Sequence, residues 1–302
     1  MSKITAFVSF RYCCFLLLLT TTKIICQENY TARWYTADND ELYQNSINAI
    51  IQDKHHFIWM TTENGIVRFD GNNFIVFNSS NTTLEHNRFK DIFGSTEKDS
   101  LTSFNESKKE LVFIKNAKVQ ILKKNRPKYS LTRNGKHFFF HDGLPSNFTI
   151  DKRERFFIRL SSGDIYFLDS EKIELCDSKM KSISKIAFKN DNIFNFFALD
   201  NTLFYLSSDG NYQCFSKKGT SSGKLNAFNA NHKLYWNITT GQVFLSVKNK
   251  IYKLKNLNGK LTAEFIVEYK ELEANTIIAI YYDQNNNKLY LGSGTNGLCV
   301  IS

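Results

Sequence analysis

The residues of this chain that are best suited to holding a ligand are polar side chains in short loops between apolar runs. Carboxylate, amide and hydroxyl groups in such loops can hydrogen-bond a sugar or a peptide, although the same groups also serve as ordinary turn residues. The candidates for ligand binding are Glu63, Asn64, Ser162, Asp209 and Asn296, in loops that we expect to join the second and third strands of small β-sheets. No catalytic residue is predicted, because the acidic residues are scattered and no serine lies in a nucleophile motif.

Histidines occur in two places that could suggest a metal site. His137 and His141 flank three phenylalanines. Residues four apart on a strand share a face but lie about 13 Å apart along it, too far to hold one ion without a bend. The pair His55 and His56 falls in a predicted hairpin corner. We therefore predict no metal site and no cofactor.

The elements that must position these loops are short β-strands. Residues 46–77 contain four short apolar runs separated by turn residues, and nothing in them has a helical period. Asn64-Gly65 and Asp70-Gly71 tolerate positive φ, so both favour tight hairpin turns. Trp59 is expected to pack between sheets, and Asp70 to accept backbone hydrogen bonds in its corner. The stretch therefore predicts one four-stranded antiparallel sheet.

The same pattern recurs along the chain at intervals of roughly 46 residues. A period of about 40 to 50 residues with four strands in each unit is what a β-propeller requires. We therefore predict an all-β protein, a β-propeller of about six blades. The equivalent second-strand positions are Trp59, Phe113, Ile158, Tyr205, Phe244 and Tyr290.

The last repeat stops after its third strand, so the last blade is expected to be incomplete. Closing a propeller requires a complete last blade or a strand from the other terminus. Either the segment around residues 33–35 completes this blade, or the chain is a truncated piece of a longer protein. We favour truncation.

Composition supports a folded extracytoplasmic domain. The chain has 302 residues, of which 42% are hydrophobic and 15% aromatic, which is enough for a substantial core. Its formal net charge is +10, but the lysines are spread through turns, so direct binding of nucleic acid is not expected. Residues 1–27 resemble a signal peptide or signal anchor. The apolar run from Tyr12 to Leu19 within them is short for a membrane span. Residues 28–302 form the predicted propeller domain.

The six cysteines do not predict a disulfide framework. Cys13, Cys14 and Cys26 lie in the leader, and the residues before Cys26 are not the small ones that lipidation of a cysteine requires. Cys176 and Cys214 remain with Cys299, an odd number at wide spacing. We expect isolated buried thiols, with a Cys176–Cys214 bridge as the alternative.

Three segments resemble the two-component regulator propeller family, the extracytoplasmic sensor regions of bacterial hybrid histidine kinases and related regulators. Residues 42–74 resemble the opening blade of that family, and residues 289–298 fit its repeat. The segment 142–147, with Gly143, Pro145 and Asn147, is similar to the recurrent motif between its blades. The chain departs from the family at Glu41, where glycine is frequent, and at Met60-Thr61, where an Ile-Gly pair is usual.

The resemblance implies a periplasmic or secreted sensor without catalysis in this segment. In complete family members, further blades, a β-sandwich, a membrane helix and a kinase or DNA-binding output follow. It also implies an oligosaccharide or another small ligand, a homodimer formed through the parent protein, and membrane attachment only through the leader or a downstream segment. Two alternatives stay open. A secreted propeller hydrolase or lyase requires convergent acidic residues, and a protein-binding scaffold requires a large exposed apolar patch.

Overall fold

The structure is a computed structural model. It describes residues 30–302 except 40–41, 106–109, 124–129, 134–135, 140–155, 169–170, 180, 191 and 226–231. The predicted leader, residues 1–27, lies outside the described residues, as does the motif with Gly143, Pro145 and Asn147. All the described strands belong to the second of the chain's two units, Ala32–Ser302.

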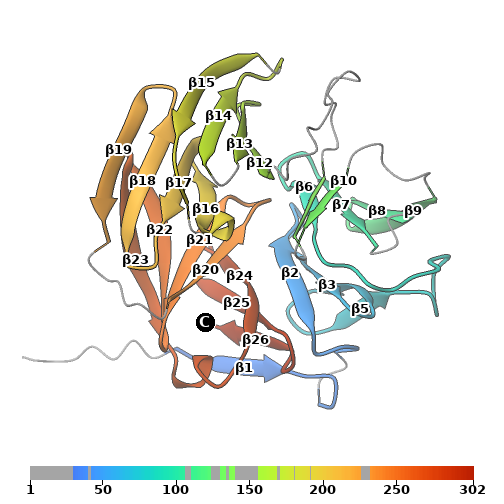
Figure 1. Cartoon of the computed structure of the whole chain (residues 1–302). Coiled ribbons are helices and arrows are strands. Elements are labelled where there is room, and N and C mark those ends of the chain that lie inside the picture. The colour runs from blue at the N-terminus through green and yellow to red at the C-terminus, as the bar shows by residue number, and fades with distance from the viewer. Residues whose placement is uncertain are drawn as a thin grey trace, which may run out of the picture. The chain divides into compact units, whose positions relative to one another are not determined.

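The described strands of the second unit form six four-stranded antiparallel sheets (Figure 1). The first sheet contains β2 (Ile47–Gln52), β3 (Ile58–Thr62), β4 (Gly65–Phe69) and β5 (Phe74–Phe77). The second contains β6 (Phe93–Ser95), β7 (Ser100–Phe104), β8 (Glu110–Lys115) and β9 (Lys118–Lys123). The third contains β12 (Phe156–Arg159), β13 (Ile165–Leu168), β14 (Lys172–Cys176) and β15 (Ser182–Ala187).

The remaining three sheets come from the second half of the chain. The fourth contains β16 (Phe196–Leu199), β17 (Thr202–Leu206), β18 (Asn211–Ser216) and β19 (Gly219–Lys224). The fifth contains β20 (His232–Asn237), β21 (Gln242–Val247), β22 (Lys250–Leu257) and β23 (Lys260–Glu268). The last contains β24 (Ile277–Asp283), β25 (Lys288–Ser293), β26 (Leu298–Ile301) and β1 (Ala32–Tyr35). A separate hairpin, β10 (Ser130–Arg133) and β11 (Lys136–Phe139), lies between the second and third sheets in sequence.

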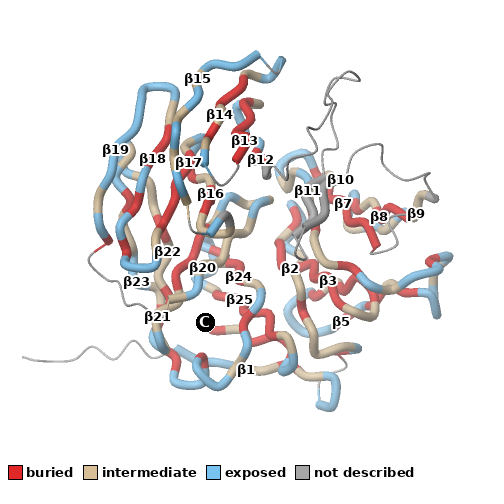
Figure 2. The backbone as a smooth tube through the Cα atoms, viewed as in Figure 1, coloured by how far each residue is buried: buried red, intermediate tan, exposed pale blue. Residues whose placement is uncertain are grey.

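Among the described residues, neighbouring sheets pack face to face through five apolar clusters. These clusters join the second sheet to the first, the first to the last, the last to the fifth, the fifth to the fourth and the fourth to the third. A middle strand covered on both faces is buried along its whole length, as all five residues of β3 are. The outer strand β19 is exposed almost throughout. Figure 2 shows the buried residues concentrated in the middle strands. The predicted fold class, an all-β propeller of antiparallel four-stranded blades, is confirmed.

The last sheet receives its fourth strand from the beginning of the described chain. The C-terminal run supplies three strands, as expected, and β1 pairs antiparallel with β26 from Ala32 opposite Ile301 to Tyr35 opposite Leu298. The C-terminal run by itself is thus an incomplete blade, as predicted, and the segment around residues 33–35 supplies its fourth strand, as in the first of the two alternatives. The physical reason is that an unpaired β26 would leave a row of backbone donors and acceptors without partners.

The repeat assignment is shifted by one strand in two sheets. Trp59, Tyr205, Phe244 and Tyr290 lie on second strands, as predicted, whereas Phe113 lies on the third strand of its sheet and Ile158 on the first. The second sheet begins with β6, a strand of three residues that is too short to give a period-two signal. Residues 130–133 follow that sheet in sequence but pair with β11.

Two aspartates hold equivalent corners between first and second strands. The Asp53 carboxylate accepts hydrogen bonds from the main-chain nitrogens of His55 (2.8 Å) and Phe57 (3.0 Å) and from Trp59 Nε1 (2.7 Å). In the last sheet burial alone would raise the pKa of Asp283. Hydrogen bonds from the amides of Asn286 and Gln52 outweigh this effect and hold that pKa below its usual value.

The other predicted structural residues lie in hairpin turns. Asp70 accepts hydrogen bonds from the main-chain nitrogens of Asn72 and Asn73 at 2.8 and 2.7 Å. Gly65 and Gly71 have φ of +118° and +104°, in the region that favours glycine. Among the described cysteines, Cys176, Cys214 and Cys299 are free and buried, so the alternative Cys176–Cys214 bridge is absent.

Candidate functional site

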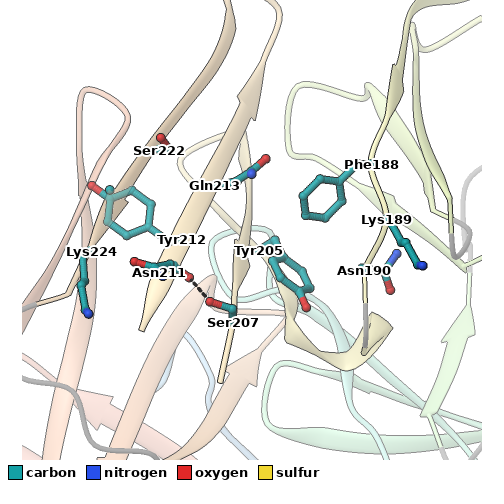
Figure 3. Close-up of a pocket in the computed structure, with 11 residues that line it drawn as sticks. Phe188, Lys189, Asn190, Tyr205, Ser207, Asn211, Tyr212, Gln213, Ser222 and Lys224 are labelled. Carbon is teal, nitrogen blue, oxygen red and sulfur yellow. Dashed lines mark hydrogen bonds between the residues drawn. The ribbon is translucent and has the colours of Figure 1, made fainter. Parts of the chain in front are cut away.

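A groove of about 730 Å³ lies between the third and fourth sheets (Figure 3). One wall comes from the residues that follow β15, and the other from β17, β18 and β19. The described residues that line it are Phe188, Lys189, Asn190, Tyr205, Ser207, Asn211, Tyr212, Gln213, Ser222, Gly223 and Lys224. Its size falls within the range of about 300–1,000 Å³ that is usual for small-molecule sites.

The aromatic part of the groove is fixed by packing between the two sheets. The Phe188 ring lies edge-on to Tyr205 and to Phe215, with ring centroids 5.1 Å apart in each pair, and 5.9 Å from Phe196. Tyr205 and Phe215 are buried, whereas Phe188 is partly exposed. The groove therefore has a rigid aromatic base that can contact the apolar face of a ligand.

Alternation along β18 and β19 places a row of polar side chains on the same side of the fourth sheet. Asn211 pairs with Lys224, and Gln213 pairs with Ser222. All four are exposed. Because side chains alternate between the two faces of a strand, the ring of the buried Tyr212 lies on the opposite face. Figure 3 shows Gln213 directed towards Phe188 across the groove.

Tyr212 also explains the glycine at position 223. The two residues are cross-strand partners, and a Cβ built on Gly223 would lie 2.4 Å from the Tyr212 hydroxyl oxygen. A larger residue would displace the tyrosine and the strand that carries Ser222 and Lys224. The absence of a side chain at Gly223 therefore keeps this wall of the groove in place.

The charged side chains among the described lining residues are both lysines, Lys189 and Lys224. Asp209 carries a carboxylate beside the groove, in the turn between β17 and β18, and this group is turned towards its own loop. It accepts hydrogen bonds from the Ser207 hydroxyl, from the Asn211 main-chain nitrogen (3.1 Å) and from Asn211 Nδ2 (2.5 Å). These bonds, that of Ser207 foremost, lower the pKa of Asp209. The described lining of the groove itself therefore carries two positive charges and no negative one.

The five residues predicted to bind a ligand are divided among four sheets. Glu63 and Asn64 lie in the β3–β4 turn, Asp209 in the β17–β18 turn and Asn296 in the β25–β26 turn, all loops between second and third strands, as expected. Ser162 lies between β12 and β13, which are the first and second strands of their sheet. Its predicted place with the other loops is therefore wrong, because hairpins between first and second strands lie at the opposite end of a sheet.

Most of these side chains are engaged within their own turns or with a neighbouring turn. Glu63 forms an ion pair with Arg88 (2.9 Å), and Asn64 accepts a hydrogen bond from Asn87 Nδ2 (3.3 Å). The Ser162 hydroxyl donates to Asp164 (2.7 Å), and the Asn296 amide donates to Asn275. Only Asp209 adjoins the groove, where it holds the lining residues Ser207 and Asn211. The lining residues themselves were missed, because the contact between Phe188 and β17 is not local in sequence.

A second, smaller cavity of about 100 Å³ lies among β2, β20, β24 and residues 91–93. The β20–β21 turn contacts other sheets there. Asn237 Nδ2 donates to the Ile50 carbonyl (2.8 Å) and the Thr239 hydroxyl to the Ile92 carbonyl (2.7 Å). These polar groups are used to hold sheets together, so the larger groove is the better candidate site.

Metal-ligating side chains do not cluster in the described part of the chain. No group of three metal-ligating side chains is present there; His137 lies on β11, and His141 lies outside the described residues. The His55 ring instead lies 3.3 Å from the Asp99 carboxylate. No described helix has the length and apolar character needed to cross a membrane.

Comparisons with known proteins support the fold alone. No protein-family model matches the chain, and no curated protein matches it. The chain is similar to PorZ, an essential surface component of the type-IX secretion system of Porphyromonas gingivalis, with a TM-score of 0.56 and 12% identity over 88% of this chain and 37% of that one. The WD40 β-propeller domain of Doa1 gives a TM-score of 0.51 and 9% identity, over 91% of this chain and 97% of that one.

A third solved structure is the extracellular domain of a putative hybrid two-component system from B. thetaiotaomicron. Its TM-score is 0.44 with 15% identity, over 91% of this chain and 42% of that one. The present chain thus spans less than half the length of this structure and of PorZ.

Proposed function

We propose that this chain is a ligand-sensing, extracytoplasmic β-propeller domain of a bacterial two-component-type regulator, and that the groove between the third and fourth sheets is its ligand site. The extracytoplasmic part of the proposal is supported by the signal-like residues 1–27. The regulatory part is supported by the resemblance of residues 42–74 and 289–298 to that family.

The observation that carries the ligand site is the lining of the groove. Gln213 and Ser222 are exposed, and neither side chain makes a hydrogen bond to a described residue, so their donors and acceptors face solvent beside the aromatic base. Polar groups placed around an aromatic surface are typical of sites for oligosaccharides and other small ligands. An oligosaccharide or another small molecule is therefore the proposed ligand.

Binding is favoured over hydrolysis at this site. A glycoside hydrolase requires two carboxylates on either side of the scissile bond. The described lining of the groove contains none, and Asp209 is held in its turn. Signalling output, dimerisation through a parent protein and attachment to a membrane would then depend on the leader or on regions outside the described residues.

The proposal is tested by calorimetry and thermal-shift screening of the secreted chain against a panel of oligosaccharides and small metabolites. At least one compound should bind, and the double variant Gln213→Ala/Ser222→Ala should weaken its binding roughly five- to 150-fold, from two hydrogen bonds of about 0.5–1.5 kcal/mol each. Gln120→Ala is the matched control, because Gln120 is exposed on the outer strand β9 of the second sheet.

Two results would contradict the proposal in different ways. If no compound in the panel binds or stabilises the chain, the proposed sensing function is contradicted. A ligand whose affinity is unchanged in the double variant would show that the function is right and the groove is the wrong site.

A further inference from the structure

The two lysines of the groove come from different sheets. Lys189 follows β15 of the third sheet, and Lys224 ends β19 of the fourth. Figure 3 shows them on opposite sides of the groove, with the aromatic residues Phe188 and Tyr205 between. Both side chains are exposed. A molecule in the groove would therefore have an ammonium group on each side.

Neither lysine has an ion-pair partner among the described residues, unlike several other lysines of the same sheets. Lys217 lies 2.7 Å from the Asp164 carboxylate, and Lys185 lies 3.5 Å from that of Glu174. In the fifth sheet Lys255 pairs with Glu264 at 2.8 Å. The groove lysines thus add two uncompensated positive charges to one concave surface, where the potential is focused.

The carboxylate of Asp209, beside the groove, is engaged within its own turn. It is held by Ser207 and by both nitrogens of Asn211, so it cannot approach Lys224 without breaking three hydrogen bonds. This arrangement keeps the negative charge in the turn and leaves the lysines available to a ligand.

We infer, on the basis of the ligand site proposed above, that the ligand is an organic anion bearing carboxylate or sulfate groups on a ring. Lys189 and Lys224 bind its anionic groups from the two sides. Gln213 and Ser222 hydrogen-bond its neutral oxygens, and the partly exposed Phe188 contacts the apolar face of the ring. The neutral counterpart of the same molecule lacks the ionic interactions with the two lysines.

The test uses matched probes on the secreted full chain. Trigalacturonate is the probe with carboxylate groups, and a sulfated disaccharide is the probe with sulfate groups. Trigalacturonate methyl ester has the same skeleton as the first probe without its charge. At low salt an anionic probe should bind at least five-fold more tightly than the neutral ester. The affinity for that probe should fall as sodium chloride is raised from 50 to 300 mM, because exposed charges are screened.

Charge-removing variants locate the effect. Lys189→Gln and Lys224→Gln should each weaken binding of the anionic probe about three-fold, and the double variant about ten-fold, as expected for exposed ion pairs. Lys218→Gln is the matched control, because Lys218 is an exposed lysine in the β18–β19 turn and does not line the groove. Its binding should equal that of the unmodified chain.

The outcomes separate this inference from the proposed function. Equal binding of the acid and its ester, or unchanged affinity in the double lysine variant, overturns the inference and leaves ligand sensing standing. Binding of neutral compounds alone does the same. Absence of binding by every charged and neutral probe overturns both.

Discussion

The buried tryptophan of the first sheet offers the sharpest test of how this fold is held. Trp59 is fully buried, its ring stacks on Phe77 with centroids 5.8 Å apart, and its Nε1 donates to the Asp53 carboxylate at 2.7 Å. Trp59→Phe keeps an aromatic ring between the sheets and removes the donor. Asp53 retains its two main-chain partners but is left with one unsatisfied, buried oxygen.

The magnitude follows from two contributions. Losing a hydrogen bond to a buried charged group costs about 1.5–3 kcal/mol of the free energy of unfolding. The smaller ring leaves a cavity that costs about 1 kcal/mol more. The sum, about 3 kcal/mol, corresponds to a fall in Tm of roughly 6–12 °C for a domain of this size.

Trp236→Phe is the matched control. Trp236 Nε1 is also buried, but it has no hydrogen-bond partner among the described residues. This substitution should cost only the ring volume, about 1 kcal/mol. Urea and thermal unfolding of both variants give the comparison. Equal destabilisation of the two, within about 0.5 kcal/mol, would refute the idea that the Asp53 bond stabilises the corner.

Three further predictions concern a turn, the closing strand and acid stability. A Cβ at Gly65 would lie 2.5 Å from the Phe77 carbonyl oxygen, whereas one at Gly71 meets nothing within 4 Å, so by thermal unfolding Gly65→Ala should cost clearly more than the roughly 1–3 kcal/mol of backbone strain expected for Gly71→Ala; equal costs would contradict this. Trp34 Nε1 donates to the Tyr269 hydroxyl at 2.8 Å and to Glu271 at 3.0 Å, so Trp34→Phe should accelerate proteolysis of β1, and unchanged cleavage kinetics would show that these contacts do not hold the strand. Because the folded-state pKa of Asp283 is lowered, the stabilising contribution of its carboxylate is present above about pH 4 and is lost as pH falls through that pKa. Urea unfolding midpoints measured between pH 7 and 3 should therefore decline less steeply in Asp283→Asn than in the unmodified chain. Parallel curves for the two proteins would argue against this contribution.

Much of the architecture could be read from short-range patterns. The turn residues at Gly65 and Gly71 and the recurring apolar runs predicted antiparallel hairpins in repeated units. The prediction failed in detail where the local signal was weak. The three-residue strand β6 was missed, which shifted the second sheet by one strand, and Ser162 was assigned to the wrong end of the third sheet.

The candidate site was far less accessible to sequence reasoning. Asp209 was predicted as a ligand residue, and it adjoins the groove without lining it. In the sequence, Gln213 and Ser222 are ordinary polar residues of a strand pair. They line a groove only because Phe188 of the preceding sheet packs beside them. The positive character of the groove depends equally on two lysines that are separated by more than thirty residues.

Local sequence patterns specify the kind of unit, since hairpin turns and alternating side chains act between residues that are close in the chain. Which units meet depends on the packing of the whole domain. This packing brought β1 to the free edge of β26, and it placed Lys189 across a groove from Lys224. The reason is that an exposed sheet edge or face can be satisfied by any suitable partner, and the choice depends on how all the sheets pack together.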